Sequence, residues 1–170
     1  SRTAPQIVFL GRLVSAKGVR VLLQAAALLK QKSQPFALVI VGDGPDRQTL
    51  EQLTRELLLT NEVRFAGKLS DHELQTVFAH ADILAAPSLA GEVFGLSLAE
   101  SMFRGIPIVA SDLGSYAELL QGTGLLFRTG DAESLASRLA ELLGDPTLRR
   151  RLASQARDRV LDFCSPERMI

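Results

Sequence analysis

The chain has 170 residues, of which 46% are hydrophobic and 22% charged, close to the composition of an ordinary globular domain. This composition excludes disordered, collagen-like and coiled-coil chains, and the length suffices to bury one core without disulfides or metals. Nineteen basic and nineteen acidic side chains cancel, which argues against a general binding surface for nucleic acid. No apolar run approaches the roughly 20 residues that cross a bilayer, and one cysteine cannot form an intrachain disulfide. We therefore expect one soluble domain over residues 1–170, in a reducing compartment such as the cytoplasm.

Short apolar runs alternate with segments of helical periodicity along the whole chain. The apolar runs predict strands at residues 7–10, 37–41, 63–66, 83–86, 106–110 and 125–127. The periodic segments predict helices at residues 19–29, 50–58, 71–79, 96–103, 132–143 and 148–161. Ser70 followed three residues later by Glu73 is a capping-box pattern, which predicts where the third of these helices begins.

Strands that are apolar throughout have no polar face to show to water, so both faces of the predicted sheet must be covered. Helices between successive strands can supply that cover, and the expected fold is α/β, a doubly wound Rossmann-like parallel sheet with helices on both faces. In this architecture the strand-to-helix loops meet at the carboxyl edge of the sheet, where ligands bind. The pattern places these loops at residues 11–18, 42–46, 67–70, 87–95 and 111–116.

The loop after the first strand carries two cations on a glycine-flanked turn. Arg12 and Lys17 lie between Gly11 and Gly18, just before a predicted helix. A helix N-terminus offers free backbone N–H groups, to which arginine adds a fork of donors and lysine a mobile charge. This combination suits a diphosphate, although solvated loop cations give the same pattern. The order Lys-Gly differs from the Gly-Lys-Ser/Thr order of a P-loop.

Two glycines, Gly42 and Gly44, follow the second predicted strand. Arg47 stands where a dinucleotide fingerprint has its third glycine, and the loop belongs to the second strand-helix unit instead of the first. The pattern is therefore only weakly typical of a nicotinamide site. It fits either a tight turn that leaves the sheet or the close approach of a ligand to Gly42.

Two glutamates eight positions apart flank the start of the fourth predicted helix. Glu92 lies in the loop and Glu100 about one turn into the helix, while Gly95 permits close approach of a ligand to the backbone. The free N–H groups of a helix that opens near Leu96 face the same mouth. Carboxylates accept hydrogen bonds from vicinal hydroxyls, so the pair could hold two parts of one sugar-containing ligand. The alternative is a solvated acid together with an acid stabilised by the helix dipole.

The segment from Glu92 to Ser111 has the pattern Glu-x-Phe-Gly-Leu-x-x-x-Glu-Ser-Met-x-x-Gly-x-Pro-x-Val-Ala-Ser, which resembles the Glu-x7-Glu signature of retaining GT-B glycosyltransferases of family GT4. The family pattern is also matched, in order, by Gly11-Arg12-Leu13 with Lys17-Gly18, Val41-Gly42-Asp43-Gly44-Pro45, Phe65-x-Gly67, and Ala81-Asp82 before Pro87-Ser88. The resemblance covers nearly the whole chain. It implies that residues 1–170 are the C-terminal donor-binding half of such an enzyme, and that the N-terminal acceptor domain is absent from this sequence.

The resemblance implies a role for each matching residue. Arg12 and Lys17 would bind the donor diphosphate and Glu92 would contact the transferred sugar, and these three are the catalytic candidates. Glu100 would accept the ribose hydroxyls. The other donor-binding candidates are Gly11, Gly42, Phe65, Gly67, Leu69, Phe94, Gly95 and Leu96. The backbone of residues 94–96 would line the phosphate and sugar, whereas residues 65–69 and the Gly42 turn would lie near the base.

The implied activity is retaining transfer of a hexose from a nucleotide diphosphate sugar, with UDP favoured over GDP or ADP, in polysaccharide or glycoconjugate synthesis. No cofactor or metal is expected, because two cations and a helix terminus can offset the leaving diphosphate and the sequence has no Asp-x-Asp motif. The acceptor, a saccharide or lipid-linked saccharide, would be held by the N-terminal domain. The whole protein is expected in the cytoplasm, with any peripheral contact to the inner face of the membrane made through that domain. No nucleic acid is expected as a partner.

Two other functions stay open, a sugar-nucleotide epimerase of the GT-B fold and a nucleotide-sugar-binding module without catalysis. The isolated domain is expected to bind donor with little or no transfer. The sequence departs from the family at residues 114–118, where Gly-Gly-x-Pro-Glu is common, and at Val93, where a small residue or proline is common. We expect structural or solvated roles for His72 and His80, and an exposed helix face for residues 149–151.

Overall fold

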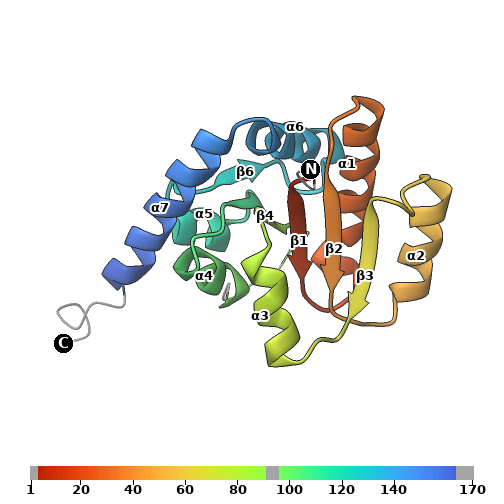
Figure 1. Ribbon diagram of the computed structural model, residues 1–170, viewed down its shortest axis with the longest axis horizontal. Coiled ribbons are helices and arrows are strands. Elements are labelled where there is room, and N and C mark those ends of the chain that lie inside the picture. Colours follow the sequence, from red (N-terminus) through yellow and green to blue (C-terminus); the bar gives the residue numbers. More distant parts are fainter. Residues whose placement is uncertain (1–3, 91–95, 164–170) are drawn as a thin grey trace.

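Six parallel strands form a single sheet in the computed structural model of the protein, which describes residues 4–90 and 96–163. The strand order is β3-β2-β1-β4-β5-β6 (Figure 1). The strands are β1 Gln6–Leu10, β2 Ala37–Val41, β3 Val63–Gly67, β4 Ile83–Ala86, β5 Ile108–Ser111 and β6 Leu125–Phe127. The chain builds the sheet outward from β1 to β3 and then returns to the other side of β1, so the order reverses between β1 and β4.

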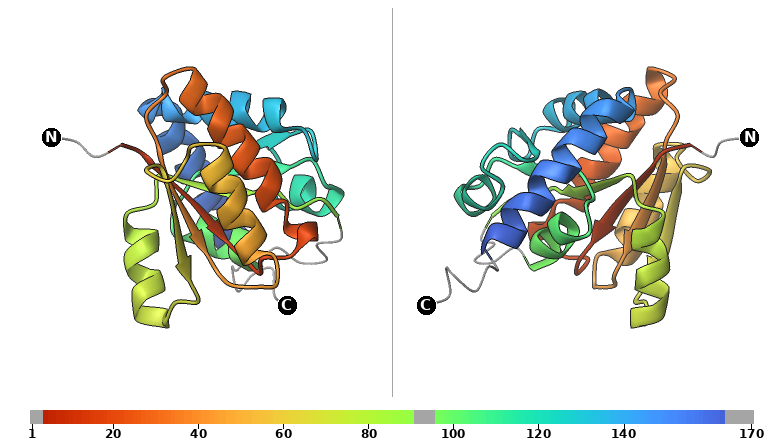
Figure 2. Two further views of the ribbon diagram at one scale, coloured as in Figure 1. Left: turned by 90° about the vertical axis from the view of Figure 1, so that its right-hand side faces the viewer. Right: turned by 60° about the vertical axis from the view of Figure 1, so that its left-hand side comes forward.

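Helices cover both faces of the sheet (Figures 1 and 2). They are the 3-10 helix η1 Ser15–Lys17 and the α-helices α1 Val19–Gln31, α2 Arg47–Glu56, α3 Asp71–Ala79, α4 Leu96–Phe103, α5 Gly114–Leu120, α6 Ala132–Leu143 and α7 Pro146–Phe163. One core cluster joins the sheet to α1, α2, α6 and the first half of α7, and a second joins it to α3, α4, α5 and the second half of α7. The predicted doubly wound, Rossmann-like α/β fold is confirmed.

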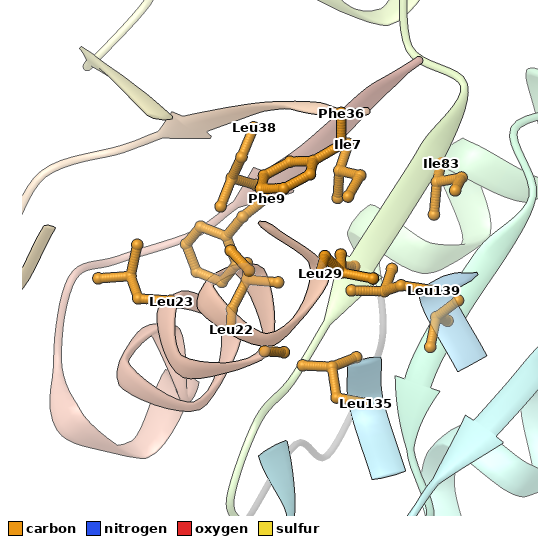
Figure 3. Close-up of a cluster of buried hydrophobic side chains, with 14 of the residues drawn as sticks. Ile7, Phe9, Leu22, Leu23, Leu29, Phe36, Leu38, Ile83, Leu135 and Leu139 are labelled. Atoms are coloured by element: carbon orange, nitrogen blue, oxygen red, sulfur yellow. The ribbon is translucent and has the colours of Figure 1, made fainter. Parts of the chain in front are cut away.

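Successive residues of β1 belong to different cores because side chains of a strand alternate between the two faces of a sheet. Ile7 and Phe9 pack in the first cluster and Val8 in the second, all at most 3% exposed. Figure 3 shows the first cluster, in which Phe9 meets Leu22 and other side chains of α1. Complete burial of one such side chain contributes about 1.5–3 kcal/mol. The N-terminus of α1 is thereby fixed directly behind the loop that follows β1.

The predicted strands and helices are largely confirmed, and the differences have local causes. β5 begins at Ile108 instead of residue 106. α2 ends at Glu56 instead of residue 58, because Leu58 adopts a left-handed conformation with φ +60° and is 73% exposed. The Ser70 cap is confirmed, since its hydroxyl accepts a hydrogen bond from the Glu73 backbone N–H at 3.2 Å.

The expectation of a loop over residues 111–116 is wrong. β5 continues to Ser111, and α5 begins at Gly114. This helix has only seven residues and starts with glycine, so its intrinsic helical preference is low. Tyr116 and Leu120 are 3% and 1% exposed, and their burial in the second core stabilises the helix.

The arginines of α7 hold the C-terminal ends of two other helices. Arg149 donates hydrogen bonds from Nη1 to the backbone oxygens of Leu142 and Leu143 at the end of α6. Arg159 donates to the Leu119 oxygen at 2.6 Å and to the Glu118 oxygen at 2.9 Å, near the end of α5. The expectation that residues 149–151 form an exposed face is therefore correct for residues 150 and 151 but wrong for Arg149, which is partly buried. No helix among the described residues is long and apolar enough to cross a membrane.

Candidate functional site

The carboxyl ends of β1 and β4 lie side by side at the point where the strand order reverses. In doubly wound sheets this switch point opens a crevice in which ligands bind. The loop after β1, residues 11–18, and the segment after β4, which begins with Pro87, flank this crevice. We call residues 11–18 the first loop.

Backbone hydrogen bonds fix the first loop on the turn that follows β2. The Gly11 N–H donates to the Val41 oxygen at 3.0 Å, and the Leu13 N–H donates to the Asp43 oxygen at 3.0 Å. In return, the Asp46 N–H donates to the Leu13 oxygen at 3.1 Å. The Leu13 side chain is fully buried in the first core and anchors the middle of the loop. The first loop is therefore held in place before any ligand arrives.

Gly42 makes this contact between the two loops possible. Its φ is +127°, and a Cβ atom at this position would lie 1.9 Å from the Gly11 oxygen. The backbone of Gly11 occupies the space that a side chain at position 42 would need. This favours the interpretation of Gly42 as part of a tight turn. The Gly42 N–H also donates to the oxygen of Gly67, the last residue of β3, at 2.8 Å, so the end of β3 joins the same cluster.

The first loop also contacts the segment after β4. The Leu89 N–H donates to the Ala16 oxygen at 2.8 Å. Gly18, with φ +75°, lies directly against the Pro87 oxygen. The loops after β1, β2 and β4 and the end of β3 are thus connected through backbone groups at the carboxyl edge, where the sequence predicted that these loops meet.

The two predicted phosphate-binding cations lie on this fixed loop. Arg12 is exposed, and Lys17 is partly buried in the last turn of η1. Glu92, Phe94 and Gly95 lie outside the described residues. Leu96 is the first residue of α4, which opens at the same edge of the sheet.

Glu100 lies in the second turn of α4, with its side chain 47% exposed. Its carboxylate accepts a hydrogen bond from Arg104 Nη2 at 3.1 Å, one helical turn away. The Arg104 guanidinium in turn lies over the Phe78 ring, 4.8 Å from its centroid. The carboxylate thus keeps an exposed side, and its role toward ribose stays a prediction. Sequence reasoning missed Arg104, which the i,i+4 spacing of opposite charges could have indicated.

The predicted base-binding residues lie in and after β3. Phe65 is partly buried against the first core, and Leu69 is partly buried against the second. Gly67 has φ +71°, and a Cβ atom there would lie 3.1 Å from Arg47 Nη1. The absent side chain leaves the room that this guanidinium occupies.

Arg47 is a second residue that sequence reasoning missed at this edge. Its guanidinium donates to Glu51 at 2.8 Å and to Asp43 at 3.4 Å. The hydrogen bond to Glu51 is the main cause that raises the pKa of Arg47 above its ordinary value. Arg47 therefore connects α2 with the loop after β2 and lies beside Gly67 at the end of β3. It stands where a dinucleotide fingerprint has its third glycine.

The two histidines lie at the surface, in agreement with the structural or solvated roles expected for them. His72 is exposed on α3 and His80 is exposed just after its end, where His80 Nδ1 lies 2.9 Å from the Thr76 backbone oxygen. Within residues 4–90 and 96–163, no group of three or more His, Cys, Asp and Glu side chains is placed to hold a metal ion.

A doubly wound sheet with a cationic loop fixed at its switch point defines a Rossmann-like ligand-binding domain. A family model described as glycosyl transferases group 1 matches residues 1–159, and the chain belongs to this family. This confirms the predicted family, and the fold is that of GT-B glycosyltransferase domains.

Phosphatidyl-myo-inositol mannosyltransferase of Mycobacterium leprae is 34% identical over 162 residues, which cover 94% of this chain and 42% of that protein. The GDP-mannose-dependent alpha-(1-6)-phosphatidylinositol monomannoside mannosyltransferase of Mycobacterium tuberculosis is 33% identical over 149 residues, covering 83% and 39% respectively. The structure of Anabaena Alr3699/HepE in complex with UDP-glucose is similar with a TM-score of 0.83 and 28% identity, over 94% of this chain and 44% of that one. The chain thus spans less than half the length of these proteins.

Proposed function

We propose that this chain is the donor-binding domain of a retaining glycosyltransferase that takes a nucleotide diphosphate sugar, with UDP-sugar as the preferred donor. The observation that carries the proposal is the fixed position of the first loop, which bears Arg12 and Lys17 and contacts both the Gly42 turn and the Pro87–Leu89 segment. A diphosphate at the first loop would place the base toward Gly67 and the sugar toward the β4 side.

The charges at this edge suit a leaving diphosphate. Arg12, Lys17 and the N-terminal N–H groups of α4 would stabilise the negative charge that develops when the sugar departs, and such electrostatic stabilisation is usually the largest catalytic effect. The proposal requires no metal ion for this role. Glu92 would orient the transferred sugar, and the exposed side of the Glu100 carboxylate would accept the ribose hydroxyls.

The nucleotide base of the donor is uracil or guanine. The complex of Alr3699/HepE with UDP-glucose supports a UDP-sugar donor. The 33% identical relative that is GDP-mannose-dependent supports GDP-mannose as a second candidate. We place UDP first, and the two donors can be separated by direct binding.

In the whole protein, an N-terminal domain would hold the acceptor hydroxyl of a saccharide or lipid-linked saccharide. The relative named phosphatidyl-myo-inositol mannosyltransferase supports a lipid-linked acceptor. Residues 1–170 by themselves should then bind donor but transfer little sugar, because the acceptor would be held by that other domain.

Calorimetric titration of this chain with UDP, GDP and ADP tests the proposal. We expect UDP to bind most tightly, and a product assay with UDP-glucose and simple acceptors to show little or no transfer. Tighter binding of GDP would replace UDP by the second candidate. Failure of all three nucleotides to bind would contradict the assignment as a donor-binding domain. Robust transfer by the chain alone would contradict the assignment of the acceptor to another domain.

A further inference from the structure

Tyr116, the single tyrosine of the chain, donates a hydrogen bond from its hydroxyl to Ser88 Oγ at 3.1 Å. Both residues are 3% exposed, and they come from α5 and from the segment after β4. A phenol hydroxyl buried among apolar groups is stable only when it is hydrogen-bonded. This bond therefore fixes the position of Ser88 relative to α5.

The segment Pro87–Leu89 is held on its other side by the first loop. The Leu89 N–H donates a hydrogen bond to the Ala16 oxygen at 2.8 Å. Gly18 lies so close to the Pro87 oxygen that a side chain at position 18 would not fit. The segment thus lies between the loop that bears Arg12 and Lys17 and the helix that bears Tyr116.

A second buried hydroxyl bonds the last residue of β4, just before this segment. Ser111 is fully buried at the end of β5, and its Oγ donates to the Ala86 oxygen at 3.4 Å. The Tyr116 ring itself packs in the second core, which also contains Leu98 and Met102 of α4. Ring packing and hydroxyl bonding are therefore separable, because phenylalanine keeps the ring and removes only the hydroxyl.

We propose that Tyr116 is a positioning residue for the donor sugar. Through Ser88 it sets where the Pro87–Leu89 segment lies against the first loop, on the β4 side of the switch point. The inference rests on the proposed function, in which the first loop binds the diphosphate and the sugar lies toward the β4 side. UDP needs only the first loop, whereas a UDP-sugar also needs the β4 side to lie at the correct distance from that loop.

Tyr116→Phe separates these two contacts. In calorimetry the variant should bind UDP within about twofold of the wild type, while its Kd for UDP-glucose rises by about fivefold or more. The same titrations are made with GDP and GDP-mannose. The comparison between wild type and variant uses the nucleotide and sugar nucleotide that the wild type binds. The inference would be overturned if the Kd for the sugar nucleotide stayed unchanged. It would also be overturned if this Kd rose by the same factor as the Kd for the nucleotide alone.

Ser88→Ala and the double variant complete the cycle. Ser88→Ala removes the same hydrogen bond from its other side, and the double variant removes both hydroxyls. The double variant should bind UDP-glucose no more weakly than Tyr116→Phe, because both lack the same bond. Independent, additive losses would show that the two hydroxyls do not act together.

Hydrogen exchange of the ligand-free chain distinguishes this inference from the proposed function. Tyr116→Phe should raise exchange by about fivefold or more in the peptide covering residues 86–96 and leave the peptide covering residues 37–50 unchanged. If the first peptide is unaffected, the positioning role is wrong whatever the chain binds. If exchange rises there but the wild type binds no nucleotide, Tyr116 positions the segment and the proposed donor function is the part that fails.

Discussion

Gly18 lies so close to Pro87 that a Cβ atom at position 18 would fall 1.9 Å from the Pro87 carbonyl oxygen. Position 18 ends the first loop and Pro87 follows β4, so this contact joins the two sides of the switch point. Gly18 also has φ +75°, a conformation that favours glycine. The two loops that would hold the diphosphate and the sugar can therefore meet only because residue 18 has no side chain.

Replacing Gly18 by alanine should destabilise the protein more than the same change at Gly122. Gly122 has a similar φ of +82° but nothing within 4 Å of its Cβ position, so it measures backbone strain alone. We expect Gly122→Ala to lower the free energy of unfolding by about 1 kcal/mol and Gly18→Ala by about 3 kcal/mol or more. Urea unfolding of both variants measures the difference, and equal losses would show that the loops part easily.

The arginines of α7 should differ in their contribution to stability according to their contacts. Arg149→Ala and Arg159→Ala remove charged donors from partly buried helix ends, and each should lower the free energy of unfolding by about 1–3 kcal/mol. Arg150→Ala and Arg157→Ala change exposed residues of the same helix and should stay within about 0.5 kcal/mol of the wild type. Similar effects at all four positions would argue against the helix-end role.

The two glutamates should differ in what they bind. Glu100→Gln should weaken UDP itself, because a carboxamide presents N–H donors where the ribose hydroxyls need an acceptor. Arg104→Gln removes the Arg104–Glu100 ion pair but keeps the carboxylate, so it should leave UDP affinity nearly unchanged. Glu92→Gln should also leave UDP affinity nearly unchanged, while transfer by the full-length enzyme falls steeply.

Calorimetry on these three variants and turnover of the full-length enzyme test the division. Loss of UDP binding in Glu92→Gln but not in Glu100→Gln would reverse the two roles. Equal losses in Glu100→Gln and Arg104→Gln would assign the effect to the ion pair instead of to the ribose.

Asp112 should make stability depend on pH in the acid range. The hydrogen bond from the Thr129 hydroxyl, followed by that from the Thr129 N–H, lowers the pKa of the Asp112 carboxyl. A carboxyl whose folded pKa is depressed stabilises the protein above its unfolded pKa of about 3.9, and this stabilisation is lost as the pH falls through the folded pKa.

Asp112→Asn should therefore melt below the wild type at pH 7, and the two melting curves should converge as the pH falls below about 4. Asp158→Asn, at an exposed position of α7, serves as the control and should follow the wild type throughout. A difference between Asp112→Asn and the wild type that stays constant from pH 7 to pH 2 would show that protonation of Asp112 is not its cause.

The sheet could be predicted from the sequence because buried parallel strands are continuously apolar. The runs at residues 37–41, 83–86 and 125–127 coincide with β2, β4 and β6. The helix α5 could not be predicted, because its stability comes from packing of Tyr116 and from Arg159, which lies 40 residues away from the Leu119 oxygen that it binds. Helical periodicity over seven residues is too short to reveal such a helix.

The edge of the sheet at which the candidate loops lie could be predicted from the sequence, since strand-to-helix loops of a parallel sheet share one edge. The contacts that fix these loops could not be predicted. Arg47 approaches Gly67, and Tyr116 reaches Ser88, only because the folded sheet brings distant segments together. The i,i+4 spacing of Glu100 and Arg104 is compatible with their ion pair and could have indicated it. No pattern in the neighbouring sequence indicates the Tyr116–Ser88 bond.

The most direct test of the account compares UDP with uridine on the first loop. Calorimetric titrations are run on the wild type, on Arg12→Ala and Lys17→Ala, and on Lys32→Ala, which removes an exposed charge at the far end of α1. Charge-assisted hydrogen bonds contribute about 1.5–3 kcal/mol, so Arg12→Ala and Lys17→Ala should each lower the affinity for UDP by about tenfold or more. Both should leave the affinity for uridine nearly unchanged. Lys32→Ala should change neither affinity. Equal losses for UDP and uridine, or no loss at either loop position, would contradict the placement of the diphosphate at the switch point.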